Sequence, residues 1–351
     1  MQSKRIGYID AMRGFTMILV VYNHITCHCW GNEEMAFNDC LMRFRMPLFF
    51  FISGWVFYKA ERLWERKTIQ SVLRKKFMVQ IIPFSVFFLL YLYVKDCIDL
   101  KYLGSDKHGY WFTFVLFEFF VLYVLLAFLF QRKAGDNKGD WKMFLSILFI
   151  SVISFYYSLY YTRYETELGY VKVILGFFSF VKLRYFIFFW FGTFVRKNFD
   201  RFVELTENAL FMAVVIVLFF FMTLFPVVYS LEGFKYPASL FTGFCGIIIV
   251  FTFFRRKESF FSKEKMVGGT LQFIGRRTLD IYLIHFFFLP YNLKWLGDML
   301  QTDENKVIEA LIAFLLALVV TAVSLLVSEV LRLSPFLAHY LFGAKLQSET
   351  R

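Results

Sequence analysis

Residues 5–29 read RIGYIDAMRGFTMILVVYNHITCHC, an apolar run long enough to cross a membrane. The run nevertheless carries Asp10, Arg13, Asn23 and His24. Polar and ionisable groups inside a membrane helix are costly, so they are candidates for function. A helix turns about 100° and rises about 1.5 Å per residue, so Arg13 and His24 lie within about 20° of one face and about 16 Å apart along the axis. Because Asp10 is near the same face, the stretch predicts a polar stripe that ends in an imidazole.

The composition places the chain among membrane proteins with several spans. Hydrophobic residues make up 59% of the 351 residues, the mean hydropathy is +0.57 and there are 51 Phe, whereas soluble domains are about 45–50% apolar. The formal net charge of +12 would by itself suit nucleic acid binding. The Lys and Arg residues, however, gather in alternate loops between apolar segments, which is typical of a membrane protein. We therefore expect membrane lipids, and no nucleic acid, as partners.

Ten apolar segments predict ten transmembrane helices in an all-α membrane protein, which forms one domain over residues 1–351. The sixth segment is the least regular because it contains Lys182 and Arg184. Two interpretations of it stay open: one span, or a surface segment (171–181) followed by a span (185–195). Basic residues in short loops mark the cytoplasmic side, and their alternation predicts that both termini are cytoplasmic. The ten segments are 12–29, 46–60, 77–95, 111–130, 141–161, 171–195, 209–230, 236–254, 271–291 and 307–331.

His24 is the first candidate for catalysis. A lone His in an apolar helix is more often a packing residue than a catalyst, but this one shares a face with Arg13 and Asp10 and follows Asn23. A neutral imidazole can take a proton from a hydroxyl near neutral pH. Arg13 either snorkels to lipid phosphate or holds an anionic group near the base. Asp10 is expected to cap the first helical turn or to pair with Arg13.

The second span begins in FRMPLFFFISGW (44–55). Pro47 suits a position in the first turn of that helix. Arg45, just before it, could meet an acceptor or a lipid headgroup. Ser53 is a candidate nucleophile, but without a GxSxG context it is more typical of a small packing residue.

Three further regions carry candidate polar residues. The run Arg74-Lys75-Lys76 suits either anionic lipid or the phosphates of a nucleotide-like cofactor. Trp111 begins the fourth span where interfacial aromatic residues are common, and Glu118 is a candidate buried carboxylate within it. The ninth span carries a second intramembrane imidazole, His285. It also carries Arg276, Arg277 and Asp280, and Asp280 can pair with either arginine at helical spacing.

Five cysteines form no zinc or redox spacing. Cys27-His28-Cys29 resembles a metal motif, but neighbouring side chains on a helix point about 100° apart and cannot close on one ion without unwinding. We therefore expect no metal. A disulfide among Cys27, Cys29 and Cys40 stays open if that end is extracytoplasmic, with small apolar packing as the alternative. The remaining two are Cys97 and Cys245.

Several segments together resemble the membrane acyltransferase 3 family. They are IDAMRGFTMILVVYNH (9–24), FRMPLFFFISG (44–54), YWF (110–112), FFWFGTFVRK (188–197) and FIGRRTLDIYLIHF (273–286), in the family's order. The first, second and last segments are most similar to the branch of sugar O-acetylases, which includes fucose 4-O-acetylase-like proteins. The resemblance covers about residues 5–330 and leaves 332–351 as a cytoplasmic tail.

The resemblance implies that His24 is the essential His and that Arg13 is its paired Arg. It also implies an acyl donor of the acetyl-CoA type on the cytoplasmic side and transfer to a hydroxyl of a glycan or other envelope molecule. Many members carry Arg-x-x-Arg shortly before the proline of the third span. Here KKFMVQIIPF (75–84) has Phe77 and Gln80 at those positions. Either Arg74, Lys75 or Lys76 takes that role, or the donor is held differently.

The sequence therefore predicts an integral membrane O-acyltransferase of the bacterial inner membrane. Its acceptor would be a glycan or a lipid-linked sugar, and its donor acetyl-CoA or another acyl-CoA, held by Arg13 and the 74–76 run. Two alternatives stay open. One is a secondary transporter or exporter of a small anion or lipid-linked sugar, although no inverted repeat is visible. The other is an inactive scaffold in an envelope assembly complex.

Overall fold

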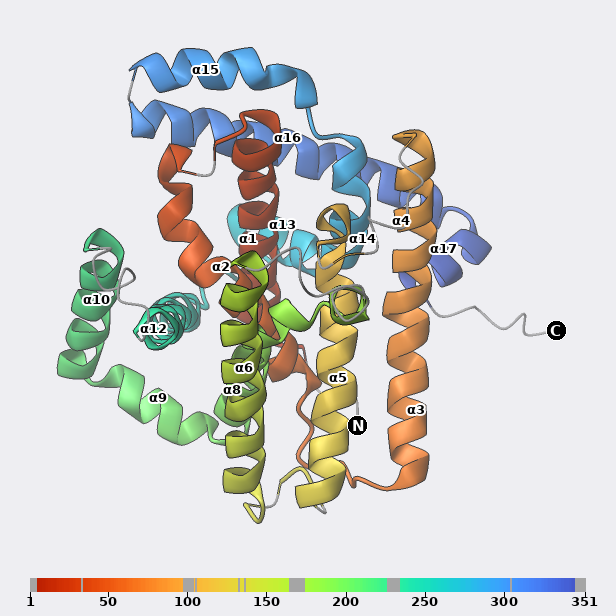
Figure 1. The fold of residues 1–351 in the computed structure, drawn as a ribbon, viewed down its shortest axis with the longest axis vertical. Coiled ribbons are helices and arrows are strands. Elements are labelled where there is room, and N and C mark those ends of the chain that lie inside the picture. The colour runs from red at the N-terminus through yellow and green to blue at the C-terminus, as the bar shows by residue number, and fades with distance from the viewer. Residues whose placement is uncertain are drawn as a thin grey trace. The chain divides into compact units, whose positions relative to one another are not determined.

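The computed structural model is a helical protein. It describes residues 5–32, 34–96, 104, 106–131, 133–135, 137–163, 174–225, 234–303 and 305–344. Within these ranges the secondary structure is α-helix with short 3-10 and π-helical segments, and the only β pairing is an isolated bridge between Leu63 and Lys133. The all-α prediction is thus confirmed for the part of the chain that the structure describes (Figure 1).

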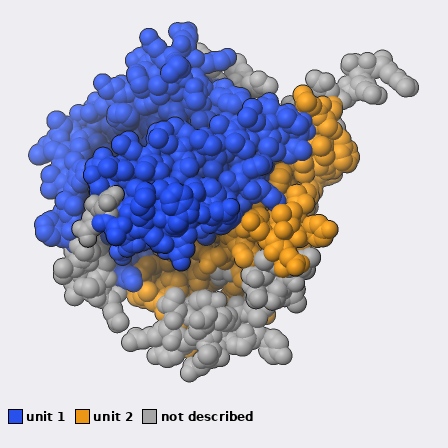
Figure 2. Space-filling view, turned by 90° about the horizontal axis from the view of Figure 1, so that it is seen from above, with its two compact units in different colours: residues 1–49, 200–331 blue, residues 50–199, 332–351 orange. Residues whose placement is uncertain are grey.

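The chain divides into two compact units, coloured separately in Figure 2. Unit 1 comprises residues 1–49 and 200–331, and unit 2 comprises residues 50–199 and 332–351. The helix α2 (Asn38–Phe57) contributes residues to both units. The expected single domain over 1–351 stays a prediction.

Unit 1 is organised around α1 (Gly7–His24), which packs against α13, α12 and α14. A Cβ atom at Gly14 would overlap the carbonyl oxygen of Leu271, and one at Gly275 would overlap that of Asp10. The backbones of α1 and α13 are therefore in direct contact, an approach that glycine permits. The other elements of this unit are η1 (Ile25–Cys29), η2 (Met35–Phe37), α9 (Phe199–Glu207), α10 (Ala209–Leu224), α12 (Lys235–Arg256), α13 (Met266–Arg276), α14 (Thr278–Ile284), η7 (His285–Phe287), η8 (Tyr291–Leu293), α15 (Lys294–Asp303) and α16 (Lys306–Arg332).

Unit 2 has an aromatic core, in which Phe50, Phe119, Phe186 and Phe189 are fully buried. Ring centroids in this cluster lie 4.7 Å apart for Phe50 and Phe119 and 5.0 Å apart for Phe119 and Phe186, within the range of favourable aromatic pairs. The elements of this unit are α3 (Arg66–Lys76), η3 (Phe77–Ile81), α4 (Ile82–Val94), η5 (Lys107–Gly109), α5 (Trp111–Phe130), α6 (Asp140–Arg163), η6 (Phe180–Tyr185), α8 (Phe186–Lys197) and α17 (Pro335–Phe342).

Six helices of the described residues are long and apolar enough to cross a membrane, and a seventh span is formed if α9 and α10, bent by 83°, count together. The predicted span 111–130 coincides with α5, and the predicted spans 236–254 and 307–331 lie within α12 and α16. A multi-pass membrane protein is therefore supported.

Three predicted spans are not among these long apolar helices. They are 12–29, 171–195 and 271–291, and each carries polar residues or a helix break. In the last, α13 ends at Arg276 and α14 begins at Thr278. In 171–195, residues 171–173 lie outside the described ranges, and the α-helix that follows η6 has only 12 residues. Twelve residues rise about 18 Å, which is less than the hydrocarbon thickness of about 30 Å.

The prediction for Pro47 is wrong. Instead of starting a helix, Pro47 lies inside α2, which begins at Asn38. The reason is local, because the left-handed backbone of Ala36 (φ 56°) and Phe37 (φ 57°) reverses the chain before Asn38, and the new helix starts there.

Candidate active site

Arg13 is held by the turn that follows α13. Its Nη2 donates a 3.0 Å hydrogen bond to Oγ1 of Thr278, the first residue of α14. The close contact of α1 with α13 brings this turn to the Arg13 side chain. Arg13 is half-buried, and Asp10 is buried near the start of α1 within electrostatic range of it. The helix is capped by Ile6 with no side-chain hydrogen bond, so the expected capping role of Asp10 is not found.

His24 ends α1 inside a cluster of rings. Its ring centroid lies 5.1 Å from that of His28, 5.2 Å from that of His285 and 4.9 Å from that of Phe286. His28 is exposed, whereas His285 is fully buried. The two imidazoles that the sequence identified separately therefore lie next to each other in unit 1.

The hydrogen bonding of His285 defines its free nitrogen. Its Nδ1 lies 2.9 Å from the carbonyl oxygen of Ile281, and a carbonyl only accepts, so Nδ1 carries the proton. The Nε2 of the neutral ring is then a lone pair, and it has no hydrogen-bond partner among the described residues. Nδ1 of His24 is likewise buried without a partner in the described part of the chain. Two imidazole nitrogens thus remain available for proton transfer or for a ligand.

A polar network supports the end of α1. Nδ2 of Asn38 donates to Oδ1 of Asn23 at 3.1 Å, and Nη1 of Arg45 donates to Oδ1 of Asn38 at 3.3 Å. All three side chains are buried. The predicted residues Asn23 and Arg45 therefore belong to one network next to His24, joined through Asn38, which the sequence reasoning missed.

The turn between α1 and α2 is tied to α16. The hydroxyl of Tyr22 donates to the carbonyl of Ala36, and the amide of Ala36 donates to Oε2 of Glu309 at 2.7 Å. Glu309 is buried near the start of α16. Its signal in the sequence was a carboxylate in the first turn of a long apolar helix.

The charged residues of the ninth segment form a separate set of contacts. Oδ2 of Asp280 accepts a 2.6 Å hydrogen bond from Ser328 and lies 4.0 Å from Nε of Arg277. Arg277 pairs more closely with Glu329, at 2.7 Å. Of the two arginines considered for Asp280, the structure selects Arg277, and Arg276 is half-buried at the end of α13.

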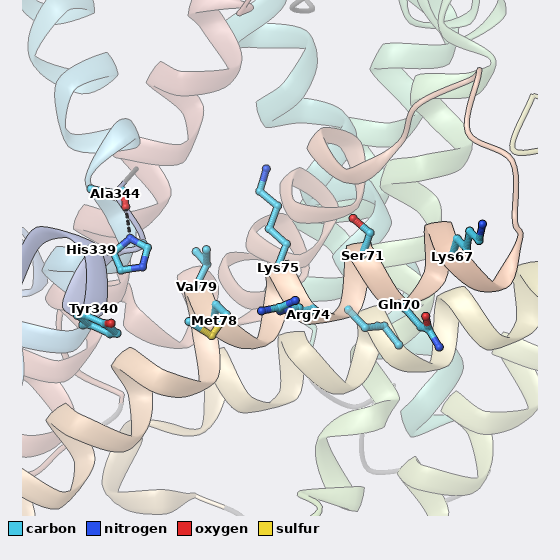
Figure 3. Close-up of a pocket in the computed structure, with 12 residues that line it drawn as sticks. Lys67, Gln70, Ser71, Arg74, Lys75, Met78, Val79, His339, Tyr340 and Ala344 are labelled. Carbon is cyan, nitrogen blue, oxygen red and sulfur yellow. Dashed lines mark hydrogen bonds between the residues drawn. The ribbon is translucent and has the colours of Figure 1, made fainter. Parts of the chain in front are cut away.

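The basic run of unit 2 is divided. Arg74 and Lys75 line a cavity of about 840 Å³ formed by α3, η3 and α17 (Figure 3). Lys76 does not line it and instead lies over the rings of Phe120 and Phe57, 3.9 Å and 5.6 Å from their centroids. The cavity also includes Lys67 and His339, which the sequence reasoning missed.

The remaining predicted residues of unit 2 lie elsewhere. Ser53 is half-buried in α2, and Trp111 begins α5 with Nζ of Lys182 4.7 Å from its ring centroid. Glu118 is half-buried in α5, and its Oε2 has no hydrogen-bond partner among the described residues. Burial lowers the pKa of Lys107, in the loop before α5, to about 8, and Glu118 opposes this shift.

Phe77 and Gln80, which replace the expected arginines, lie in the π-helical segment η3. Gln80 is buried, and its Oε1 has no hydrogen-bond partner in the described part of the chain. The described cysteines Cys27, Cys29, Cys40 and Cys245 form no disulfide, so the pairing considered among the first three is not found. Cys97 lies outside the described residues. The described ranges contain no group of three or more His, Cys, Asp or Glu that could hold a metal ion.

This geometry combines an imidazole pair, a guanidinium further along the same helix α1 and a multi-pass helical fold, which suits transfer of a group to a hydroxyl. Comparisons with curated proteins and with solved structures gave no match. A family model described as an acyltransferase domain matches residues 6–329, nearly the whole chain. The protein therefore belongs to the membrane acyltransferase 3 family.

Proposed function

We propose that this protein is an O-acyltransferase whose transfer centre is the His24 site. The observation that carries the proposal is that the ring centroids of His24 and His285 lie 5.2 Å apart. His24 is on α1, the helix that also holds Arg13. Each imidazole has a buried nitrogen without a partner among the described residues. The family supplies the reaction class, and this cluster is the part of the molecule best suited to move a proton.

In the proposed reaction, an acceptor hydroxyl attacks the carbonyl carbon of a thioester. His24 takes the hydroxyl proton as the new C–O bond forms, and that proton passes to the thiolate that leaves. In the alternative order, His24 attacks the thioester carbonyl, the C–S bond breaks and the thiolate leaves. The hydroxyl then attacks the acyl-imidazole, its C–N bond breaks to restore the neutral ring, and the hydroxyl proton passes to the thiolate. Arg13, held by Thr278, would orient or polarise the donor.

We propose acetyl-CoA, or another acyl-CoA, as the donor. Its phosphates need cationic partners, and Arg74 and Lys75 are exposed on α3 at the 840 Å³ cavity. Lys76 is a weaker candidate, because its ammonium group lies over aromatic rings. Each unit would thus carry one part of the chemistry, the transfer centre in unit 1 and a phosphate site in unit 2.

The proposal includes the acceptor and the location. The acceptor would be a glycan or a lipid-linked sugar of the cell envelope, and the enzyme would lie in a bacterial inner membrane with ten spans and cytoplasmic termini. The similarity of residues 9–24, 44–54 and 273–286 to sugar O-acetylases supports the sugar acceptor. The basic loops support the orientation.

The test is acyl transfer from radiolabelled acetyl-CoA to a panel of envelope glycans by purified protein in nanodiscs. Wild type should label a glycan, and His24→Ala should lose transfer by at least a hundredfold, within the range for a general base. Gln301→Ala, an exposed change on α15, is the control and should match wild type. Full activity in His24→Ala would refute this site. If wild type labels no glycan, binding of acetyl-CoA is measured next. Saturable binding would indicate an acyltransferase with another acceptor, whereas the transporter alternative predicts no acetyl-CoA binding.

A further inference from the structure

The cavity of unit 2 is built by two segments far apart in the sequence. One wall is the amphipathic helix α3 with η3, and the other is α17 near the end of the described chain. Figure 3 shows His339 and Tyr340 at one end of a row of side chains that continues along α3 to Lys67. The cavity, about 840 Å³, is within the range of small-molecule sites, about 300–1,000 Å³.

The α3 wall is cationic. Lys67, Ser71 and Lys75 follow one another at intervals of four residues, which places them on one helix face, with Arg74 beside them. No residue of α3 is buried, so these groups are accessible. None of the twelve residues lining the cavity, all within the described ranges, is acidic. The charge of this wall is therefore not neutralised from within the cavity.

The α17 wall is held in place by local contacts. Ser334 caps the helix by accepting from the amide of Leu337, and Gly343 ends it with a left-handed φ of 63°, which glycine adopts without strain. The guanidinium of Arg332 lies 4.6 Å from the ring centroid of Phe342, whose ring packs 6.1 Å from that of Phe87 in α4. The helix is thus anchored to unit 2.

His339 presents a fixed ring to the cavity. Its Nδ1 lies 2.7 Å from the carbonyl oxygen of Ala344, as drawn in Figure 3. Since the carbonyl only accepts, Nδ1 carries a proton and Nε2 is the nitrogen left for a ligand. When the ring is protonated, Nε2 donates, and imidazolium is a good partner for an anion.

We propose that α17 and α3 together form a pocket that binds the phosphate groups of a ligand, with Arg74, Lys75 and His339 as the contacting residues. The ligand is either the nucleotide part of the acyl donor, in which case the inference rests on the proposed function, or an anionic lipid headgroup. The family match ends at residue 329. The α17 wall is therefore a feature of this chain beyond the matched residues.

The experiment measures equilibrium binding of coenzyme A to the full-length protein in phosphatidylcholine nanodiscs. The variants are Arg74→Gln, Arg74→Lys and His339→Gln, with Lys257→Gln, an exposed cation of unit 1, as control. Losing one charged hydrogen bond should weaken binding about tenfold. We expect this loss in Arg74→Gln and His339→Gln, partial recovery in Arg74→Lys and no change in the control.

A second arm adds phosphatidylglycerol to the nanodiscs. If the pocket holds a lipid headgroup, phosphatidylglycerol should raise the thermal stability of wild type but not of Arg74→Gln or His339→Gln. In that case, the affinity for coenzyme A should be the same in wild type and in both variants. The pocket inference is overturned if Arg74→Gln changes neither the affinity for coenzyme A nor the stabilisation by phosphatidylglycerol. The role of α17 is overturned if His339→Gln matches wild type in both measurements. His24→Ala keeps coenzyme A binding in this scheme, so failure of transfer and failure of the pocket are distinguishable.

Discussion

At the scale of single residues, the candidate site depends on which imidazole nitrogens are free. The His285 ring has its orientation fixed by the carbonyl of Ile281, which leaves Nε2 without a partner among the described residues and near the ring of His24. In the proposed reaction, His285 would position His24 or would be the next acceptor of its proton. Both roles require an imidazole.

Replacing His285 by Leu should lower kcat about tenfold to a hundredfold and leave the KM for the donor nearly unchanged. The physical reason is that the change removes the imidazole next to the proposed base without changing a proposed donor contact. The matched change is His28→Leu, because His28 also stacks on His24 but is exposed, and its effect should be much smaller. Steady-state kinetics over pH 5–9 measure both. Equal losses in the two variants would contradict a special role for His285.

The loop before α5 carries a buried lysine with a testable pH effect. The Nζ of Lys107 donates to Ser179 Oγ at 2.7 Å and to the carbonyl of Phe177 at 2.9 Å. Burial nevertheless lowers its pKa from 10.5 to about 8. Between these two pH values the unfolded chain holds more protons than the folded one, so stability rises with pH.

Thermal unfolding in detergent should show this rise between pH 8 and 10.5 in wild type. The full gain corresponds to a free energy on the order of 3 kcal/mol. Other lysines and tyrosines titrate in the same range, so the measured quantity is the difference from Lys107→Met. The variant should lack this part of the slope. Identical slopes in the two proteins would show that Lys107 is not charged and buried as described.

At the scale of elements, the contact of α1 with α13 positions the whole site. It brings Thr278 to Arg13 and leads into α14 and η7, which deliver His285 to His24. The sequence predicted the polar stripe of α1 from helical periodicity alone, because that property is local. It could not pair His24 with His285 or find the partners Asn38 and Glu309, since such contacts depend on how helices far apart in the chain pack.

Gly14→Leu should therefore reduce both stability and transfer. A side chain there would meet the backbone carbonyl of Leu271, which cannot move aside like a flexible side chain. Overpacking of this kind costs about 1–3 kcal/mol or more. Ala209→Leu adds the same kind of bulk at an exposed position of α10 and should be neutral. Thermal unfolding and acetyl transfer test the pair, and a Gly14→Leu protein with wild-type stability would argue against the backbone contact.

At the scale of the whole molecule, the count of spans shows what hydropathy can and cannot predict. Hydropathy finds the long apolar helices such as α5 and α16, because every residue contributes to the signal. It is weak for the segments 12–29, 171–195 and 271–291, which carry polar residues or helix breaks. Irregular, polar segments at membrane depth are found where protein surrounds them. The residues proposed for chemistry lie mainly in two of these segments.

These three segments also decide the topology. Six helices are long and apolar enough to cross a membrane, and the bent pair α9–α10 would be a seventh span. If the three polar segments also cross, the total is ten, and an even number would place both termini on one side. The basic loops predict that this side is the cytoplasm. Tags at each end, probed with protease in intact spheroplasts and in inverted vesicles, test this directly. Both tags should be cleaved only in inverted vesicles. If the tags lie on opposite sides, the number of spans is odd and at least one of the three polar segments does not cross. The membrane depth of Arg13, His24 and His285 would then have to be determined for each segment separately.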